Sequence, residues 1–197
     1  MVDAATLPRA GAMARIFGAA EAALEAGPLT VWEMPVPAQI NLRGDPGDKA
    51  FLDTVRGVLG CALPLEPNRS VTGEEITVLW LGPDEWLVLG KPGSEGDLVA
   101  KLRGALSAFH CAVTDVTGNR AQFRLSGVPA RLLLAKGCSL DLHPSQFGPG
   151  QCAQTLVVRA GVILHQVDEA PTFDLMPRRS FAEYLWHWLQ DAMAEYR

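Results

Sequence analysis

Apolar and polar positions along the first half of this chain switch between the two-residue period of strands and the longer period of helices. A helix is predicted from Asp48, a good N-cap, to Gly60, because apolar residues recur between them at three- to four-residue spacing. A second helix is predicted after Ser94, and the sequence GPDE at 82–85 predicts a turn between two apolar runs. The predicted strands of this half cover residues 31–34, 38–42, 76–81 and 86–89.

The second half repeats this order of elements. A helix is predicted between Pro129 and Gly137, and the strands are predicted around 113–125, at 152–159, at 162–167 and near 172–176. The last helix is predicted to begin with a capping box at 180–183. Its expected buried stripe consists of Phe181, Leu185, Trp188 and Ala192, and Trp186 falls well off that stripe.

A short phrase occurs twice and supports a duplicated architecture. GCALPLEP at 60–67 returns as GCSLDLHP at 137–144, and upstream INLRGDP at 40–46 is matched by FRLSGVP at 123–129. Two copies are too few for an open solenoid. We therefore predict an α+β fold of two pseudo-repeated β-α-β-β-α halves packed together. Residues 29–197 would form one globular domain with halves at about 29–112 and 113–197, preceded by an N-terminal extension at 1–28.

Composition excludes several classes of function. The chain has 197 residues and a net charge of −5, and its one tight basic pair is Arg178–Arg179, so nucleic acid is an unexpected partner. No stretch approaches the roughly 20 apolar residues of a membrane span. Four cysteines without a close CxxC pair indicate reduced thiols, which favours a cytoplasmic location.

Motifs for catalysis are missing from the sequence. It contains no phosphate-binding loop, nucleophile elbow, HExxH or dinucleotide fingerprint. The best metal candidates are Cys138, His143 and Cys152, but their spacing matches no common zinc pattern, so we interpret them as buried thiols and a turn histidine. We predict no catalytic, cofactor-binding or metal-binding residue in this chain.

Five segments together resemble the gamma subunit family of bacterial heterotetrameric sarcosine oxidases. The resemblance covers roughly residues 30–195, in order and without large gaps. The segments are GPDEWLVLG (82–90), VTDVTGNRAQFRLSG (113–127), GCSLDLHP (137–144), FGPGQCAQT (147–155) and RRSFAEYLWHWL (178–189).

This resemblance implies a non-catalytic subunit with the fold of the folate-binding domain of aminomethyltransferases. The family's complex oxidatively demethylates sarcosine to glycine, producing hydrogen peroxide and, with tetrahydrofolate, methylene-tetrahydrofolate. FAD, FMN, NAD, zinc and tetrahydrofolate are attributed to other subunits. The expected partners are the alpha subunit directly, with beta and delta subunits in the same complex. The expected contact residues are Trp186, Arg178, Arg179, Asp84, Glu85 and Trp86.

Two other functions are weighed beside this one. An independent folate-dependent enzyme of the aminomethyltransferase type would place an acidic residue in the strand after a glycine turn. The corresponding stretch, RAGVILHQV at 159–167, has Leu164 and His165 at the expected acidic positions. A charged histidine would repel a cationic substrate amine, so this departure favours a structural subunit. The other alternative is a scaffold of a related methylamino-acid oxidase.

Overall fold

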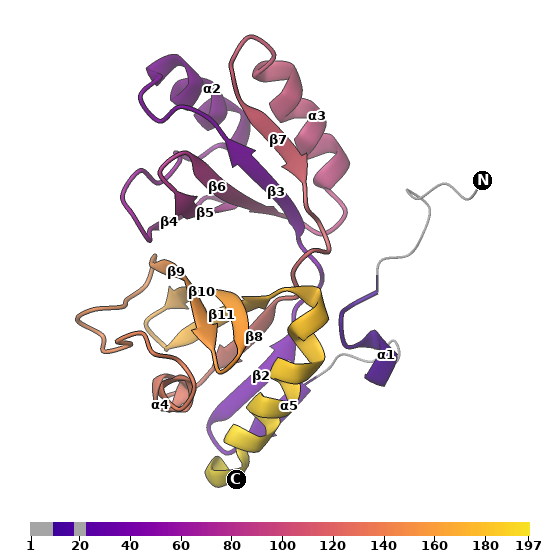
Figure 1. Cartoon of the computed structure of the whole chain (residues 1–197), viewed down its shortest axis with the longest axis vertical. Coiled ribbons are helices and arrows are strands. Elements are labelled where there is room, and N and C mark those ends of the chain that lie inside the picture. Colours follow the sequence, from indigo (N-terminus) through magenta and orange to yellow (C-terminus); the bar gives the residue numbers. More distant parts are fainter. Residues whose placement is uncertain (1–9, 18–22) are drawn as a thin grey trace.

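The computed structural model describes residues 10–17 and 23–197. Figure 1 shows two lobes, each with one β-sheet whose outer face is covered by helices. The predicted N-terminal extension lies partly outside the described residues, at 1–9 and 18–22. Its described part contains helix α1 (Ala14–Phe17) and strand β1 (Ala23–Ala26), and the side chain of Met13 is fully buried in the core of the second lobe.

The first lobe has a five-stranded antiparallel sheet with the strand order β4-β5-β6-β3-β7. Helix α2 (Lys49–Leu59) begins where the Asp48 carboxylate accepts hydrogen bonds from the backbone amides of Ala50 and Phe51, at 2.9 and 3.2 Å. It ends at Gly60, whose φ of 73° is a left-handed conformation that favours glycine. Helix α3 spans Glu95–Ala105. The strands are β3 (Ala38–Arg43), β4 (Ser70–Thr72), β5 (Thr77–Gly82), β6 (Glu85–Gly90) and β7 (Ala112–Asp115).

The second lobe has a six-stranded antiparallel sheet with the strand order β1-β2-β8-β11-β10-β9. Its helices are α4 (Ala130–Ala135) and α5 (Ala182–Ala192), with short 3-10 turns at Arg179–Phe181 and Ala194–Tyr196. Its strands after β1 are β2 (Leu29–Glu33), β8 (Phe123–Ser126), β9 (Cys152–Val157), β10 (Ala160–Asp168) and β11 (Thr172–Pro177).

The two sheets repeat the same arrangement, which confirms the predicted pseudo-repeated α+β fold. In strand order, β4, β5, β6 and β3 of the first lobe correspond to β9, β10, β11 and β8 of the second. In each lobe a helix and a Gly-Cys pair follow the matched strand β3 or β8. The fifth strand is supplied differently: β7 follows α3 in the chain, whereas its counterpart β2 precedes β3.

The chain crosses between the lobes twice, and these crossings correct one predicted strand. The expected strand at 113–125 is two strands, β7 and β8, which belong to different sheets. Residues 116–122 lie between them, and Gly118 has a left-handed φ of 83°. The other crossing joins β2 to β3. The crossings bind each other, because the Met34 amide donates to the Gln122 carbonyl at 2.8 Å and the Gln39 amide donates to Thr117 Oγ1 at 2.9 Å. The expected division between residues 112 and 113 falls within β7.

Alternation along the strands separates a helix-facing side from a side that faces the other lobe. On β6, Trp86 and Val88 pack with α2 and α3, while Leu87 and Leu89 join a small cluster shared by both sheets. Successive strand residues point to opposite faces, so every second residue belongs to the boundary between the lobes. The molecule is therefore layered as helices, sheet, sheet and helices.

Helix α5 differs from its prediction in start and in orientation. It begins at Ala182 after a 3-10 turn, and no side chain caps it in the way that the predicted box at 180–183 requires. Phe181 is 40% exposed, and Trp188 is only partly buried. The buried face consists of Ala182, Leu185, Trp186, Leu189 and Ala192. The predicted stripe was right for Leu185 and Ala192 and wrong for Phe181 and Trp188. Phe181 lies in the 3-10 turn before the helix and so outside its repeat, and the buried face is rotated from Trp188 toward Trp186.

Candidate functional site

The boundary between the lobes has an apolar centre with polar groups around it. The apolar cluster takes buried side chains from both sheets: Leu79, Leu87, Leu89, Cys152, Ile163 and Met176. The Cys152 thiol donates to the carbonyls of Arg69 and Trp80 in the first lobe, at 3.3 and 3.6 Å. Burial raises the pKa of this thiol to about 11, although its hydrogen bond to Trp80 lowers it, so the thiol stays protonated near neutral pH.

One polar group at the boundary combines an ion pair with a histidine. Arg124 on β8 donates through Nε and Nη2 to the two carboxylate oxygens of Asp174 on β11, at 2.7 and 2.8 Å. His165 on β10 lies beside them, with Nδ1 3.9 Å from Asp174 Oδ2. Its Nε2 is 3.0 Å from the hydroxyl of Ser70 on β4 in the other lobe. The group therefore connects the two sheets.

The electrostatics of this group favour a charged carboxylate. Burial alone would raise the pKa of Asp174, but the hydrogen bonds and positive charge of Arg124, together with His165, hold it below its usual range. The pair also raises the pKa of Arg124, chiefly through the hydrogen bond to Asp174. Asp174 is 3% exposed, so this is a buried pair in which each charge depends on the other.

The residue types of a nucleophile triad are present at this boundary: Ser70, His165 and Asp174. Their geometry is better suited to holding the two lobes together than to catalysis. A triad needs a carboxylate that accepts a hydrogen bond from His Nδ1 and so orients the ring. Here that distance is too long for a hydrogen bond, and both carboxylate oxygens are already held by Arg124. His165 is also 5% exposed. A cleft of about 390 Å³ lies beside the group, with Met34, Pro35 and Leu89 among its apolar walls.

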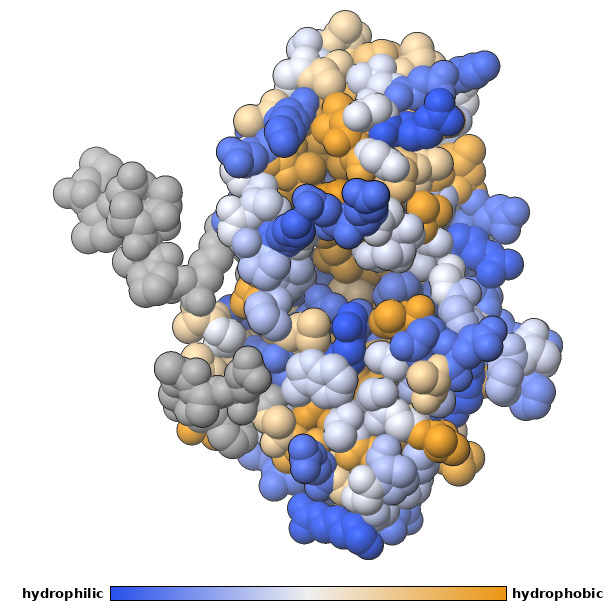
Figure 2. Space-filling view, turned by 180° about the vertical axis from the view of Figure 1, so that it is seen from behind, coloured by the Kyte–Doolittle hydropathy of each residue, from blue (hydrophilic) through white to orange (hydrophobic). Residues whose placement is uncertain are grey.

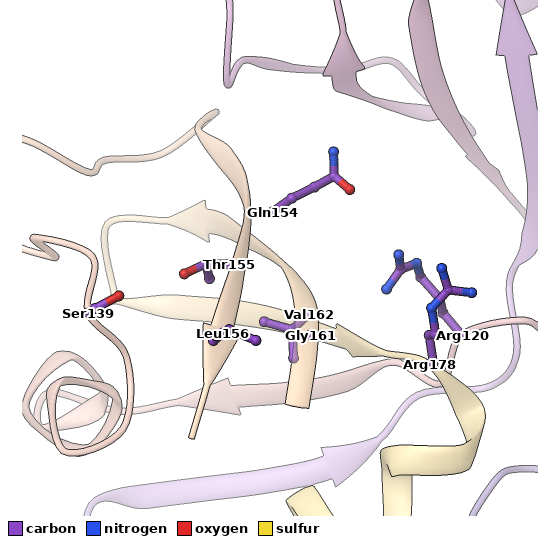
Figure 3. Close-up of a pocket in the computed structure, with 8 residues that line it drawn as sticks. All are labelled: Arg120, Ser139, Gln154, Thr155, Leu156, Gly161, Val162 and Arg178. Carbon is purple, nitrogen blue, oxygen red and sulfur yellow. The ribbon is translucent and has the colours of Figure 1, made fainter. Parts of the chain in front are cut away.

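A second polar group lies where the crossing at 116–122 meets the end of β11. Arg120 and Arg178 face each other as partners of an isolated antiparallel bridge. Figure 3 shows their guanidinium groups ending side by side, on the side of the pocket toward which Gln154 points. The cavity measures about 500 Å³ and is lined by Arg120, Ser139, Gln154, Thr155, Leu156, Gly161, Val162 and Arg178. Both arginines bring a positive charge to this cavity.

Two of the predicted contact residues are buried. Trp86 is 0% exposed, and its indole nitrogen donates to the Pro64 carbonyl at 2.8 Å. Trp186 is 1% exposed and packs against Phe123, with ring centroids 5.4 Å apart. A side chain this deep cannot contact a partner while the fold stays as described. Both tryptophans therefore belong to the helix-facing cores rather than to the surface.

The other predicted contact residues lie at or near the surface. Asp84 is exposed and pairs with Arg43 at 2.9 Å, while Glu85 accepts a hydrogen bond from Asn41 at 2.7 Å. Arg179 donates to the carbonyls of Ala10 and Gly11 at 2.9 and 3.0 Å, which ties the N-terminal segment to the turn before α5. Arg178 is exposed and lines the cavity of Figure 3.

The three cysteine and histidine residues considered for metal binding do not gather. His143 bonds to Ser145 in an exposed turn, and the Cys138 thiol lies 3.9 Å from the Thr155 hydroxyl. Across residues 10–17 and 23–197, no group of three His, Cys, Asp or Glu side chains is placed to hold a metal ion. The same part of the chain contains no helix long and apolar enough to cross a membrane. All four cysteines are described and free.

Sequence reasoning missed Arg120, Gln154, Arg124 and Asp174. The alternation of β8 and β11 carries a weak signal, because Arg124 interrupts the apolar Phe123 and Leu125, and Asp174 interrupts Phe173 and Leu175. Nothing in the sequence pairs Arg120 with Arg178. Figure 2 shows the face opposite to that of Figure 1, where hydrophobic patches on the upper lobe lie between hydrophilic residues.

The family model and the relatives found by sequence comparison point to the same protein family. The model of the sarcosine oxidase, gamma subunit family matches residues 43–195. A sarcosine oxidase subunit gamma from Corynebacterium sp. strain P-1 is 37% identical over 172 residues, which cover 87% of this chain and 83% of the relative. Its counterpart from Corynebacterium sp. strain U-96 is 36% identical over 201 residues, with 100% and 95% coverage.

Solved structures agree with the sequence comparison. A chain of the heterotetrameric sarcosine oxidase from Corynebacterium sp. U-96, solved in complex with pyrrole 2-carboxylate, superposes with a TM-score of 0.84 at 32% identity. The match covers 95% of this chain and 96% of that one. Glycine cleavage system aminomethyltransferase T from Bartonella henselae matches 83% of this chain and 46% of its own, with a TM-score of 0.63 at 15% identity. The second similarity concerns the fold alone.

Proposed function

Because this chain belongs to the sarcosine oxidase gamma subunit family, we propose that it serves its complex without a catalytic site of its own, by binding and stabilising the large alpha-type subunit. The chain is a subunit of an oxidoreductase, the heterotetrameric sarcosine oxidase. Under this proposal the complex demethylates sarcosine to glycine in the cytoplasm, with hydrogen peroxide and methylene-tetrahydrofolate as further products. FAD, FMN, NAD, zinc and tetrahydrofolate are then bound by the other subunits.

The observation that carries the proposal is that the polar residues between the lobes bind one another and so hold the fold together. In an aminomethyltransferase-type enzyme, an acid is expected at the position of Leu164 or His165. Leu164 is fully buried in the helix-facing core, and His165 is buried against Ser70 of the other lobe. The nearby acid, Asp174, is neutralised by Arg124. These residues do not offer a free carboxylate to a folate-linked substrate, which favours a supporting subunit over an independent enzyme.

The contact surface must use residues that are exposed in this chain. A stable interface of ordinary size buries about 800 Å² on each partner. Of the residues predicted from the sequence, Arg178, Arg179 and Asp84 are exposed, and Glu85 is half-buried. These four remain proposed contacts. The burial of Trp86 and Trp186 supports a role in the fold instead.

Co-expression tests the proposed function directly. The chain is produced alone, with an affinity-tagged alpha-type subunit, and with each of the other subunits in turn. We expect the chain to co-purify with the alpha-type subunit when the other subunits are absent. The isolated chain should be folded and colourless, and it should not convert tetrahydrofolate in the presence of a methylated amine. A yellow isolated chain, or folate turnover by it, would contradict the proposal.

A further inference from the structure

We infer that the cavity between Arg120 and Arg178 binds a carboxylate side chain from another subunit of the complex. This inference rests on the proposed function, since it names a contact that the assembled subunit makes. The two arginines come from distant parts of the chain. The Arg179 amide donates to the Asn119 carbonyl at 2.8 Å, and the Ala121 amide donates to the Pro177 carbonyl at 3.1 Å. These hydrogen bonds bring both guanidinium groups to the same cavity.

The two charges are not balanced within the described chain. The only hydrogen bond from the Arg120 side chain there is from Nη1 to the Met176 carbonyl, at 3.0 Å. Among residues 10–17 and 23–197, neither Arg120 nor Arg178 forms an ion pair. Burial, and after it the charge of Arg178, lowers the pKa of Arg120. A guanidinium has five N–H donors, so most of the donors at this site are free to bind a ligand.

The chemistry of the site fits a carboxylate. Arginine binds carboxylates through two parallel N–H···O bonds, which are shorter and stronger than neutral hydrogen bonds. A carboxylate between Arg120 and Arg178 would receive donors from both and would remove the repulsion between them. Gln154, on the edge strand β9, lines the same cavity, where its Nε2 donates to the Leu81 carbonyl at 2.9 Å. The ligand's hydrogen bonds would therefore come from the two arginines.

The surroundings favour a protein segment over a small free ion. The cavity of about 500 Å³ is far larger than the roughly 30 Å³ share of a water molecule. A second cavity of about 200 Å³ shares Arg120, Gln154 and Arg178 and continues to Gln39, whose buried side-chain oxygen has no hydrogen-bond partner among the described residues. Glu85 also lines this second cavity, but its carboxylate accepts a hydrogen bond from Asn41 and forms no ion pair with either arginine. At the rim, Leu156 is 55% exposed. Central arginine beside exposed apolar side chains is typical of protein interfaces.

The test measures how the full-length chain binds the tagged remainder of the complex. We expect Arg178→Gln to weaken binding at least tenfold at low salt and Arg178→Lys to weaken it less. The matched control is Arg56→Gln, which removes the same charge from the outer face of α2 and should leave binding unchanged. Wild-type binding should weaken as salt rises, because exposed charge pairs are screened beyond about 10 Å at 0.1 M. Urea unfolding of each isolated variant verifies that the fold is intact.

A carbodiimide experiment identifies the partner group. In the assembled complex carrying Arg178→Lys, the introduced amine should be joined by an amide bond to an Asp or Glu of another subunit, and mass spectrometry should locate that peptide. The same reagent on the Arg56→Lys complex should give no such product.

Three outcomes separate this inference from the proposed function. If the Arg178→Gln variant binds as tightly as the wild type and no cross-link forms, the inference is overturned while the proposed function stays intact. Acetate that binds the isolated chain at this cavity without any effect of Arg178 on assembly would also overturn it. If the wild-type chain fails to co-purify at all, the proposed function fails instead.

Discussion

At the scale of single residues, buried aromatic and charged side chains decide which surfaces this chain can offer. Trp86 and Trp186 fill the helix-facing cores of the two lobes, one against Phe51 and the other against Phe123. Asp174 and Arg124 both lie on the faces of their strands that point away from the helices, and they pair at the lobe boundary. The same residue types would serve an interface if they were exposed, so burial, rather than residue type, separates their roles.

Removing the Trp186 ring tests its place in the core. We expect Trp186→Ala to lower the free energy of unfolding by about 3 to 5 kcal/mol, because the site loses apolar contact and keeps a cavity. Tyr184→Ala on the same helix is the control, since Tyr184 is 40% exposed and its loss should cost far less. Urea denaturation followed by circular dichroism measures both. Equal effects of the two substitutions would show that Trp186 is not packed as described.

The Arg124–Asp174 pair predicts that part of the free energy of unfolding is lost at acidic pH. The pKa of folded Asp174 lies below its ordinary value of 3.8, so the pair stabilises the fold above that value. This contribution is lost as the pH falls from about 4 through the lower folded pKa. Asp174→Asn should lower the free energy of unfolding at pH 7 by about 3 kcal/mol, because the partly buried Arg124 loses its partner. The variant should also lose less stability than the wild type between pH 5 and pH 2, as urea titrations at each pH would measure.

At the scale of elements, the close approach of β2 to β8 depends on a glycine. Gly127 has a φ of 128°, and a Cβ atom there would lie 2.0 Å from the Pro28 carbonyl oxygen, which is backbone and cannot rotate away. Gly127 directly follows the last residue of β8 and begins the three-residue turn into α4. The turn into α4 and the pairing of β8 with β2 therefore both rely on the absent side chain.

Alanine substitutions at two glycines distinguish a position that cannot hold a side chain from one where glycine only lowers helix propensity. We expect Gly127→Ala to destabilise the chain by about 1 to 3 kcal/mol, since the left-handed backbone and the clash with Pro28 both oppose a side chain. Gly57→Ala lies within α2, where a Cβ would meet nothing within 4 Å, and should stabilise by about 0.5 to 1 kcal/mol. Thermal unfolding midpoints should move in opposite directions. A Gly127→Ala chain as stable as the wild type would contradict the described turn.

At the scale of the whole molecule, the contacts between the two lobes predict that they unfold as one cooperative unit. They share the apolar cluster around Leu79 and Ile163, and the two crossings hydrogen-bond to each other. His165 and Ser70 add a polar link between the sheets. We expect the lobes to keep a fixed relative position when a partner binds, because they cannot open without loss of the shared cluster.

Hydrogen exchange measures this coupling. Leu79→Ala should lower stability by about 2 to 5 kcal/mol. The most protected amides of β6 and β10, which lie in different lobes, should lose protection by the same amount, because both exchange through global unfolding. If only the amides of the first lobe lose protection, the lobes unfold independently and the shared cluster does not couple them.

Local patterns in the sequence determined the elements and their duplication. Hydrophobic periodicity and turn residues placed α2 from its Asp48 cap to Gly60, and the repeated Gly-Cys phrase follows the matched strands β3 and β8. Such features depend on neighbouring residues in the chain, so a single sequence carries them. The family was identifiable for the same reason, since its motifs are contiguous.

Only the tertiary structure decided which side chains meet across the lobes. Contacts between distant segments decide three features: β7 and β8 belong to different sheets, Arg120 pairs with Arg178, and Trp186 is buried. Strand alternation indicates that Arg124 and Asp174 face away from the helices, but not that they face each other. Long-range register and the shift of α5 by one 3-10 turn are set by packing of the whole chain, and local sequence patterns contain no information on that packing.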